Sequence, residues 1–172
     1  MATEPNASVE ATHILAFFAE YPDFEYNATA PVWKEFNRLT RYMGWNPRPG
    51  EDPEYGEARS AFAAALGQQF STFYGSDVND INAWQALCTA LGVEPIPDSL
   101  GKCRKLVKST HVNLVDFIDS RITGEPIRIF PTEKELRRYT QRTHKIFPKE
   151  SAKESGVLKY LLRRIYAPRR HG

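Results

Sequence analysis

Apolar residues recur at spacings of three and four along most of this chain, which is the period of an amphipathic helix. Prolines and glycines follow many of these runs, and Ser, Thr, Asp or Asn precede most of them, as at helix ends. The clearest start signal is the capping-box pattern Thr132-Glu133-Lys134-Glu135. The pattern predicts helices over about residues 9–21, 31–43, 54–74, 78–91, 99–108, 110–123, 132–146 and 155–167.

One run, residues 126–130, has the character of a strand, and a strand of this length needs a pairing partner elsewhere. The pattern therefore predicts an all-α fold: a single compact domain of about seven or eight short helices in an orthogonal array, with at most one short extended segment near 126–130. The length of 172 residues suits one domain. We expect a flexible leader over 1–8, the helical domain over 9–166 and a basic tail over 167–172.

The formal net charge of +2 conceals a division within the chain. Residues 1–100 contain fourteen acidic and five basic side chains, a net charge of −9, together with most of the aromatic residues. Residues 101–172 contain seven acidic and eighteen basic side chains, a net charge of +11. We therefore divide the domain into an acidic and aromatic part, 9–100, and a basic part, 101–166. Such an asymmetry indicates either an anionic partner or two parts that neutralise each other in the fold.

The basic residues of the second part fall on the polar faces of predicted helices. In the predicted helix 132–146, Lys134, Arg138 and Lys145 belong to one stripe. Two or three such faces could neutralise several phosphates, so nucleic acid is the first partner that the pattern indicates. The alternative interpretation is an ordinary solvated helix surface. The candidate anion-binding residues are Arg104, Lys105, Lys108, Lys134, Arg137, Arg138, Arg142, Lys145, Arg163 and Arg164.

Aromatic residues cluster between positions 17 and 45, most of them at helical spacing and therefore expected in the core. Tyr26 and Trp45 fall outside the apolar stripes, and both residue types favour half-wet interfaces. They are the candidate residues for protein contact. The second interpretation is therefore a protein–protein adaptor or a homo-oligomer that uses the aromatic N-terminal part.

The sequence contains no spacing that is typical of catalysis or of metal binding. Its four histidines are widely separated, and Cys88 and Cys103 stand at apolar positions without a C-x-x-C pair. Nucleophile elbows and glycine-rich phosphate loops are also absent. We expect free cysteines, no metal, no cofactor and no enzymatic activity; an enzyme without a recognisable linear motif is the third interpretation.

Several short motifs resemble a small protein module of filamentous fungi. The first part of the chain contributes Phe17-Phe18, Tyr21-Pro22, Phe24, Tyr26, Glu35-Phe36, Arg38-Leu39 and Gly44-Trp45. The likeness continues through Gln68-Gln69-Phe70, Tyr74-Gly75, Trp84, Leu87-Cys88 and Thr110-His111-Val112-Asn113-Leu114, so it spans about residues 12–165. The family is an uncharacterised one of small helical proteins. The resemblance therefore implies a complete helical domain, and it implies no activity, ligand or catalytic residue.

The first ten residues lack the basic and apolar regions of a secretory signal, and no apolar run approaches the roughly 20 residues that span a bilayer. We expect an intracellular protein, nuclear or cytoplasmic, that makes no membrane contact. The predicted function is that of a non-enzymatic interaction module. Its basic C-terminal half would dock an anionic partner, nucleic acid or another acidic surface, with little sequence specificity.

Overall fold

The computed structural model describes residues 11–147 and 156–166, and the expected leader and basic tail lie outside them. Two short strands, β1 (His111–Val112) and β2 (Ile129–Phe130), form an antiparallel pair. The helices are α1 (Thr12–Ala19), α2 (Val32–Met43), α3 (Pro53–Tyr74), α4 (Ile81–Ala90), α5 (Leu100–Ser109), α6 (Leu114–Thr123), α7 (Glu133–Thr143) and α9 (Gly156–Tyr166). Within the described residues, these helices and the one small sheet confirm the predicted all-α compact domain.

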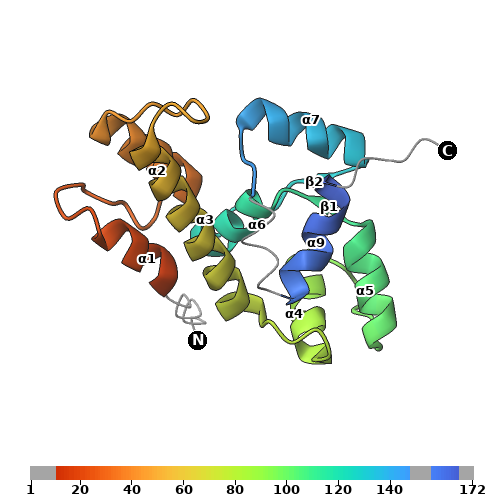
Figure 1. Ribbon diagram of the computed structural model, residues 1–172. Coiled ribbons are helices and arrows are strands. Elements are labelled where there is room, and N and C mark those ends of the chain that lie inside the picture. Colours follow the sequence, from red (N-terminus) through yellow and green to blue (C-terminus); the bar gives the residue numbers. More distant parts are fainter. Residues whose placement is uncertain (1–10, 148–155, 167–172) are drawn as a thin grey trace.

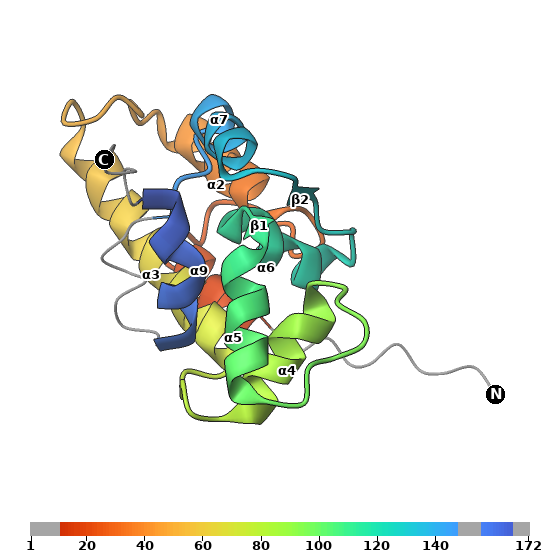
Figure 2. The same ribbon diagram turned by 90° about the vertical axis from the view of Figure 1, so that its right-hand side faces the viewer.

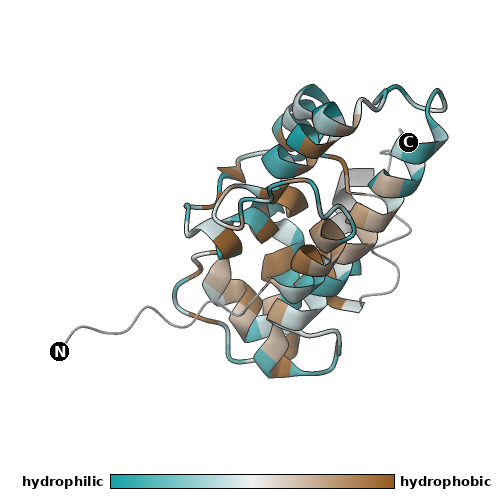
Figure 3. Ribbon diagram, turned by 90° about the vertical axis from the view of Figure 1, so that its left-hand side faces the viewer, coloured by the Kyte–Doolittle hydropathy of each residue, from teal (hydrophilic) through white to brown (hydrophobic). Residues whose placement is uncertain are grey.

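Helix α3 forms the centre of the domain (Figure 1) and contacts α1, α4, α6 and α9. Helices α1 and α2 lie on one side of it, and α4, α5 and α9 lie on the other. Helix α7 lies at the edge of the molecule, where it packs against α9 and the two strands (Figure 2). Hydrophobic residues concentrate where the helices meet, and hydrophilic residues occupy the outer turns (Figure 3).

The sequence of α3 suits this central position. Asp52 caps the helix, because its side chain accepts hydrogen bonds from the backbone N–H groups of Glu54 at 3.0 Å and Tyr55 at 3.3 Å. Small residues on the buried side of the helix let neighbouring helices approach closely, and large aromatic residues fill the space between them. Among the latter, the ring of Phe62 stacks on that of Phe36 with centroids 4.4 Å apart.

The prediction of a helix over 110–123 is wrong at its start. Residues His111 and Val112 are extended and pair with Phe130 and Ile129, so the strand-like run near 126–130 finds its partner here. Helix α6 begins only after Asn113, whose side-chain oxygen accepts a hydrogen bond from the Asp116 backbone N–H at 3.1 Å. The pairing joins segments that lie 18 residues apart, and helical periodicity carries no information about it.

The prediction of a helix over 132–146 is wrong at its end. Helix α7 stops at Thr143, because His144 takes a left-handed conformation with φ of 57°. Lys145 therefore lies outside the helix, and the stripe that the sequence suggested does not continue to it. This reversal of the chain decides where the Lys145 side chain lies.

Cys88 and Cys103 are both free and buried, which confirms the expectation of unbridged thiols. Burial raises the pKa of the Cys88 thiol to about 12, with a smaller contribution from neighbouring Cys103. Such a thiol stays protonated and behaves as a small apolar side chain. Within the described residues, no helix has both the length and the apolar character that crossing a membrane requires.

Gly156 marks a close approach between the start of α9 and the segment before α4. A Cβ atom at this position would lie 2.6 Å from Val78 Cγ1 and 2.9 Å from the Ser76 carbonyl oxygen. We expect Gly156→Ala to lower the free energy of unfolding by about 1 kcal/mol, because the backbone must shift to accept the methyl group. Urea unfolding would measure this change. The matched control is Gly101→Ala in α5, where a Cβ atom meets nothing within 4 Å. This second variant should be neutral or slightly stabilising; equal losses in the two variants would contradict the role of the close approach.

Candidate anion-binding face

Helix α7 has an exposed basic side opposite its buried side. The Thr132 hydroxyl begins the helix by accepting a hydrogen bond from the Glu135 backbone N–H at 3.2 Å. Leu136 and Thr140 are buried, and their spacing of four places them on one side of the helix. Three basic residues share the other side, where the same spacing keeps them within about 80° of arc. They are Lys134, Arg138 and Arg142, and all three are exposed.

Arg128 extends this surface from a different element. It precedes β2, and its guanidinium carbon lies 4.6 Å from the ring centroid of Phe130 and 5.4 Å from that of Tyr139. The guanidinium carbon of Arg142 lies 5.8 Å from the same Tyr139 centroid. Two arginines from separate segments thus meet at one aromatic ring. We define the basic face as Arg128, Lys134, Arg138 and Arg142.

No cation of the basic face lies within ion-pair distance of a carboxylate of the described chain. None of the ion pairs formed between described residues includes Arg128, Lys134, Arg138 or Arg142. All four side chains are exposed, so their donors are open to solvent. Exposed cations that form no ion pair are a feature that favours an anionic partner.

Two of the predicted anion-binding residues, Arg104 and Lys108, hold α5 against its neighbours. Arg104 donates a hydrogen bond to the Val78 carbonyl, and its guanidinium carbon lies 5.6 Å from the ring centroids of both Trp84 and Tyr160. The Lys108 ammonium lies 4.8 Å from the Tyr160 centroid. Both side chains are partly buried and join α5 to α4 and α9. They do not belong to the basic face.

Arg137 and Lys145 are paired with carboxylates. Arg137 forms an ion pair with Glu133 at 3.2 Å, one turn earlier on α7. The Lys145 ammonium lies 2.7 Å from Asp116 Oδ1 and 3.0 Å from the Tyr139 hydroxyl. Burial opposes the charge of Lys145, but its hydrogen bonds to Asp116 and Tyr139 outweigh this effect and raise its pKa. Lys145 is therefore a structural cation.

The remaining basic candidates lie apart from α7 or outside the described side chains. Lys105 is exposed on α5, a helix separate from α7 (Figure 1). Arg163 and Arg164 belong to α9, and their side chains lie outside the described part of the chain. The structure thus brings together Lys134, Arg138 and Arg142 from the predicted set. It adds Arg128, which the sequence analysis missed. The sequence does contain a signal for the position of Arg128. Alternate residues of a strand share one side, so Arg128, two positions before Phe130, is expected on the same side as that ring.

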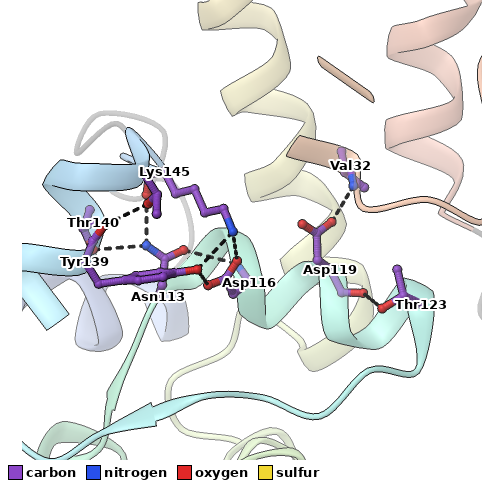
Figure 4. A network of polar contacts seen from close by, with 9 residues as sticks. Val32, Asn113, Asp116, Asp119, Thr123, Tyr139, Thr140 and Lys145 are labelled. Atoms are coloured by element: carbon purple, nitrogen blue, oxygen red, sulfur yellow. Dashed lines mark hydrogen bonds and ion pairs between the residues drawn. The ribbon is translucent and has the colours of Figure 1, made fainter. Parts of the chain in front are cut away.

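A network of polar side chains fastens α7 to α6 (Figure 4). The Tyr139 hydroxyl donates to Asp116 Oδ2 at 2.6 Å, while Asp116 Oδ1 pairs with Lys145. The Asn113 side-chain amide donates to Thr140 Oγ1 at 3.1 Å and to the Lys145 carbonyl at 3.0 Å. These bonds tie the start of α6 to the end of α7, and they fix the orientation in which the basic face meets solvent.

Asp119 lies one turn beyond this network on α6 and links that helix to α2. Its Oδ1 accepts a hydrogen bond of 2.6 Å from the Val32 backbone N–H, at the first residue of α2. Burial raises the pKa of Asp119 to about 6, although this hydrogen bond acts in the opposite direction. A cavity of about 210 Å³ adjoins Asp119, Asp116, Tyr139 and Lys145. The contacts of these groups all connect structural elements, so we interpret the network as a joint between α2, α6 and α7.

Tyr26 and Trp45, the predicted protein-contact residues, pack against the aromatic core and are partly buried. The Tyr26 ring stacks on Phe18 with centroids 4.0 Å apart, and burial raises the Tyr26 pKa to about 12. The Trp45 indole N–H donates to Glu54 Oε2 at 3.2 Å. Tyr42 and Met43, at the end of α2, are more exposed, at 56% and 40%. These contacts give Tyr26 and Trp45 a structural role.

Comparison with known proteins gives no match: no family model, curated protein or solved structure is similar to this chain. The resemblance to the fungal family stays a prediction. No group of three or more potential metal ligands occurs among the described residues. The geometry of the basic face is therefore the observation on which a functional proposal can rest.

Proposed function

We propose that this protein is a non-enzymatic interaction module that docks nucleic acid on the basic face with little sequence specificity. The observation that carries the proposal is the group of four exposed cations on one surface, none of them paired with a carboxylate of the described chain. The joint between α6 and α7 supports the proposal further. Because α7 is already held in place, binding a partner does not require the helix to lose conformational entropy.

The arrangement of the charges favours the phosphate backbone as the binding partner. Successive cations on α7 are four residues apart, which corresponds to about 6 Å along the helix axis. Contacts from lysine and arginine to phosphates supply affinity without reading base sequence. Few charges take part, so we expect weak binding that decreases as the salt concentration rises.

Fluorescence-anisotropy titration of a labelled 20-nucleotide DNA, single-stranded and as a duplex, tests the proposal at several salt concentrations. We expect binding at low salt and a slope of log K against log salt of about −2 to −4, since three or four cations contact phosphates and each contact contributes about 0.7 for a single strand and about 0.9 for a duplex. The dissociation constant should be the same for DNA molecules of different base sequence. The absence of binding to both forms at low salt would overturn the proposal.

Reversal of two charges separates a specific surface from a general effect of net charge. We expect Arg138→Glu combined with Arg142→Glu to weaken binding about tenfold or more at low salt, with the fold unchanged, because both side chains are exposed. The matched control combines Lys34→Glu with Arg41→Glu, two exposed cations on α2. An equal loss in the two double variants would contradict a binding role for the basic face.

A further inference from the structure

A groove of about 580 Å³ lies between α5 and the segment that precedes it. Its apolar lining comes from Pro95, Ile96 and Pro97 on one side and from Leu106 of α5 on the other. This volume is within the usual range of small-molecule sites, and such sites are mostly apolar with a few polar groups.

The apolar wall of the groove is open to solvent. Ile96 is 45% exposed. Helix α5 buries Cys103 and Val107, and the partly buried Leu106 beside them lines the groove. An exposed apolar wall of this kind favours an apolar ligand.

The wall is also held in place by hydrogen bonds behind it. The Pro97 carbonyl accepts a hydrogen bond from Gln85 Nε2 at 3.0 Å and one from the Cys103 thiol at 3.5 Å. Proline at two of the three wall positions fixes the backbone further. The groove therefore exists before any ligand enters, and binding does not require the segment to become ordered.

Charge at the rim of the groove defines the polar end of the ligand. Lys102 and Asp98 both line the groove, but they form an ion pair with each other at 3.1 Å. Lys105 lines it as well, is exposed, and has no hydrogen-bond or ion-pair partner among the described residues. The groove thus combines an apolar wall with one uncompensated ammonium group.

We propose that this groove binds a small apolar molecule that carries one carboxylate, with the apolar body on Ile96 and Leu106 and the carboxylate at Lys105. A single positive charge beside an apolar surface complements this class of ligand, because the carboxylate keeps water on its outer side while the hydrocarbon leaves water. The proposal is independent of the basic face, since no residue is shared between the two surfaces.

Isothermal titration calorimetry of the full chain with dodecanoate tests the proposal, at dodecanoate concentrations below the critical micelle concentration. We expect saturable binding of one molecule, with a dissociation constant in the micromolar range. Ile96→Ser should weaken binding about tenfold by removing apolar contact. Lys105→Glu should weaken it about threefold to tenfold by reversing the charge at the rim. Both side chains are exposed, so the fold should survive both changes.

Two controls make the outcome decisive. Lys34→Glu changes the net charge by the same amount as Lys105→Glu, at an exposed position of α2. This variant should leave dodecanoate binding unchanged. Dodecanol has the apolar body without the carboxylate, so it should bind the wild type less tightly than dodecanoate does. Its affinity for Lys105→Glu should equal its affinity for the wild type. The absence of saturable binding, or binding that neither Ile96→Ser nor Lys105→Glu weakens, would overturn the proposal.

Discussion

Replacement of Phe62 by alanine is expected to lower the free energy of unfolding by about 4 kcal/mol. Phe62 is fully buried at the centre of α3. Its ring stacks on that of Phe36, with the ring centroids 4.4 Å apart. The centroid of the Phe62 ring lies 5.4 Å from that of Phe17 and 6.3 Å from that of Trp33. Removing the ring leaves a cavity where α1, α2 and α3 meet, and rigid aromatic neighbours cannot collapse into it.

Urea or thermal unfolding followed by circular dichroism measures this loss, which could exceed half the stability of an ordinary domain. Tyr42→Ala is the matched control, because Tyr42 is also aromatic and lies on neighbouring α2 but is 56% exposed. We expect a change of about 0.5 kcal/mol or less for the control. Similar losses for Phe62→Ala and Tyr42→Ala would show that the aromatic core is not centred on Phe62.

Asp119 is expected to give the second largest effect, because it is a buried cap that joins two distant segments. Asp119→Ala removes the acceptor of the Val32 N–H group and should cost about 2 kcal/mol at pH 5. Asp119→Asn keeps an acceptor at this position and cannot ionise. The Asn variant should therefore be more stable than the Ala variant, and the difference isolates the hydrogen bond from the charge.

The stability of the wild type should depend on pH through Asp119. Burial raises the pKa of this carboxyl from its ordinary value of 3.8 to about 6 in the folded protein. The folded state therefore binds the proton more tightly than the unfolded chain does, and the contribution of Asp119 to stability decreases as the pH rises from about 4 to about 6. Between pH 5 and pH 7, Asp119→Asn should gain about 1 kcal/mol relative to the wild type.

Urea unfolding of both proteins at pH 5, 6 and 7 checks this dependence. Other carboxylates, such as Glu35 and Asp52, have lowered pKa values and add the opposite pH dependence. They do so in the wild type and the variant alike, so the difference between the two proteins reports on Asp119. If the wild type instead gained stability relative to Asp119→Asn as the pH rose, the ionised carboxylate would be favoured at the start of α2, contrary to the desolvation argument.

The candidate site was predictable where it depends on one helix. The capping box at Thr132 fixed the start of α7, and spacing of four placed Lys134, Arg138 and Arg142 on one side. Helix periodicity contains this information because neighbouring turns determine which residues share a face. The same reasoning extended the stripe to Lys145, where a left-handed His144 ends the helix and turns the side chain toward Asp116.

Other members of the site depend on contacts between distant segments. Arg128 joins the basic face because β2 pairs with β1 and brings it to Tyr139. Arg104 does not belong to the basic face, because its guanidinium group packs against the rings of Trp84 and Tyr160. These residues lie 20 positions before and 56 positions after Arg104 in the chain. A basic residue on the polar face of a helix looks the same in sequence whether it faces solvent or an aromatic ring.

By itself, the sequence determined the helices, the cap of α7 and most of the core, because those features follow from side-chain periodicity and from residues adjacent in the chain. Only the tertiary structure decided which charges are open to a partner. Packing of α5 on α9 covers Arg104 and Lys108, and the joint between α6 and α7 neutralises Lys145. The physical reason is that pairing and burial of a charge depend on groups that folding brings close from remote positions, and a local pattern contains no record of them.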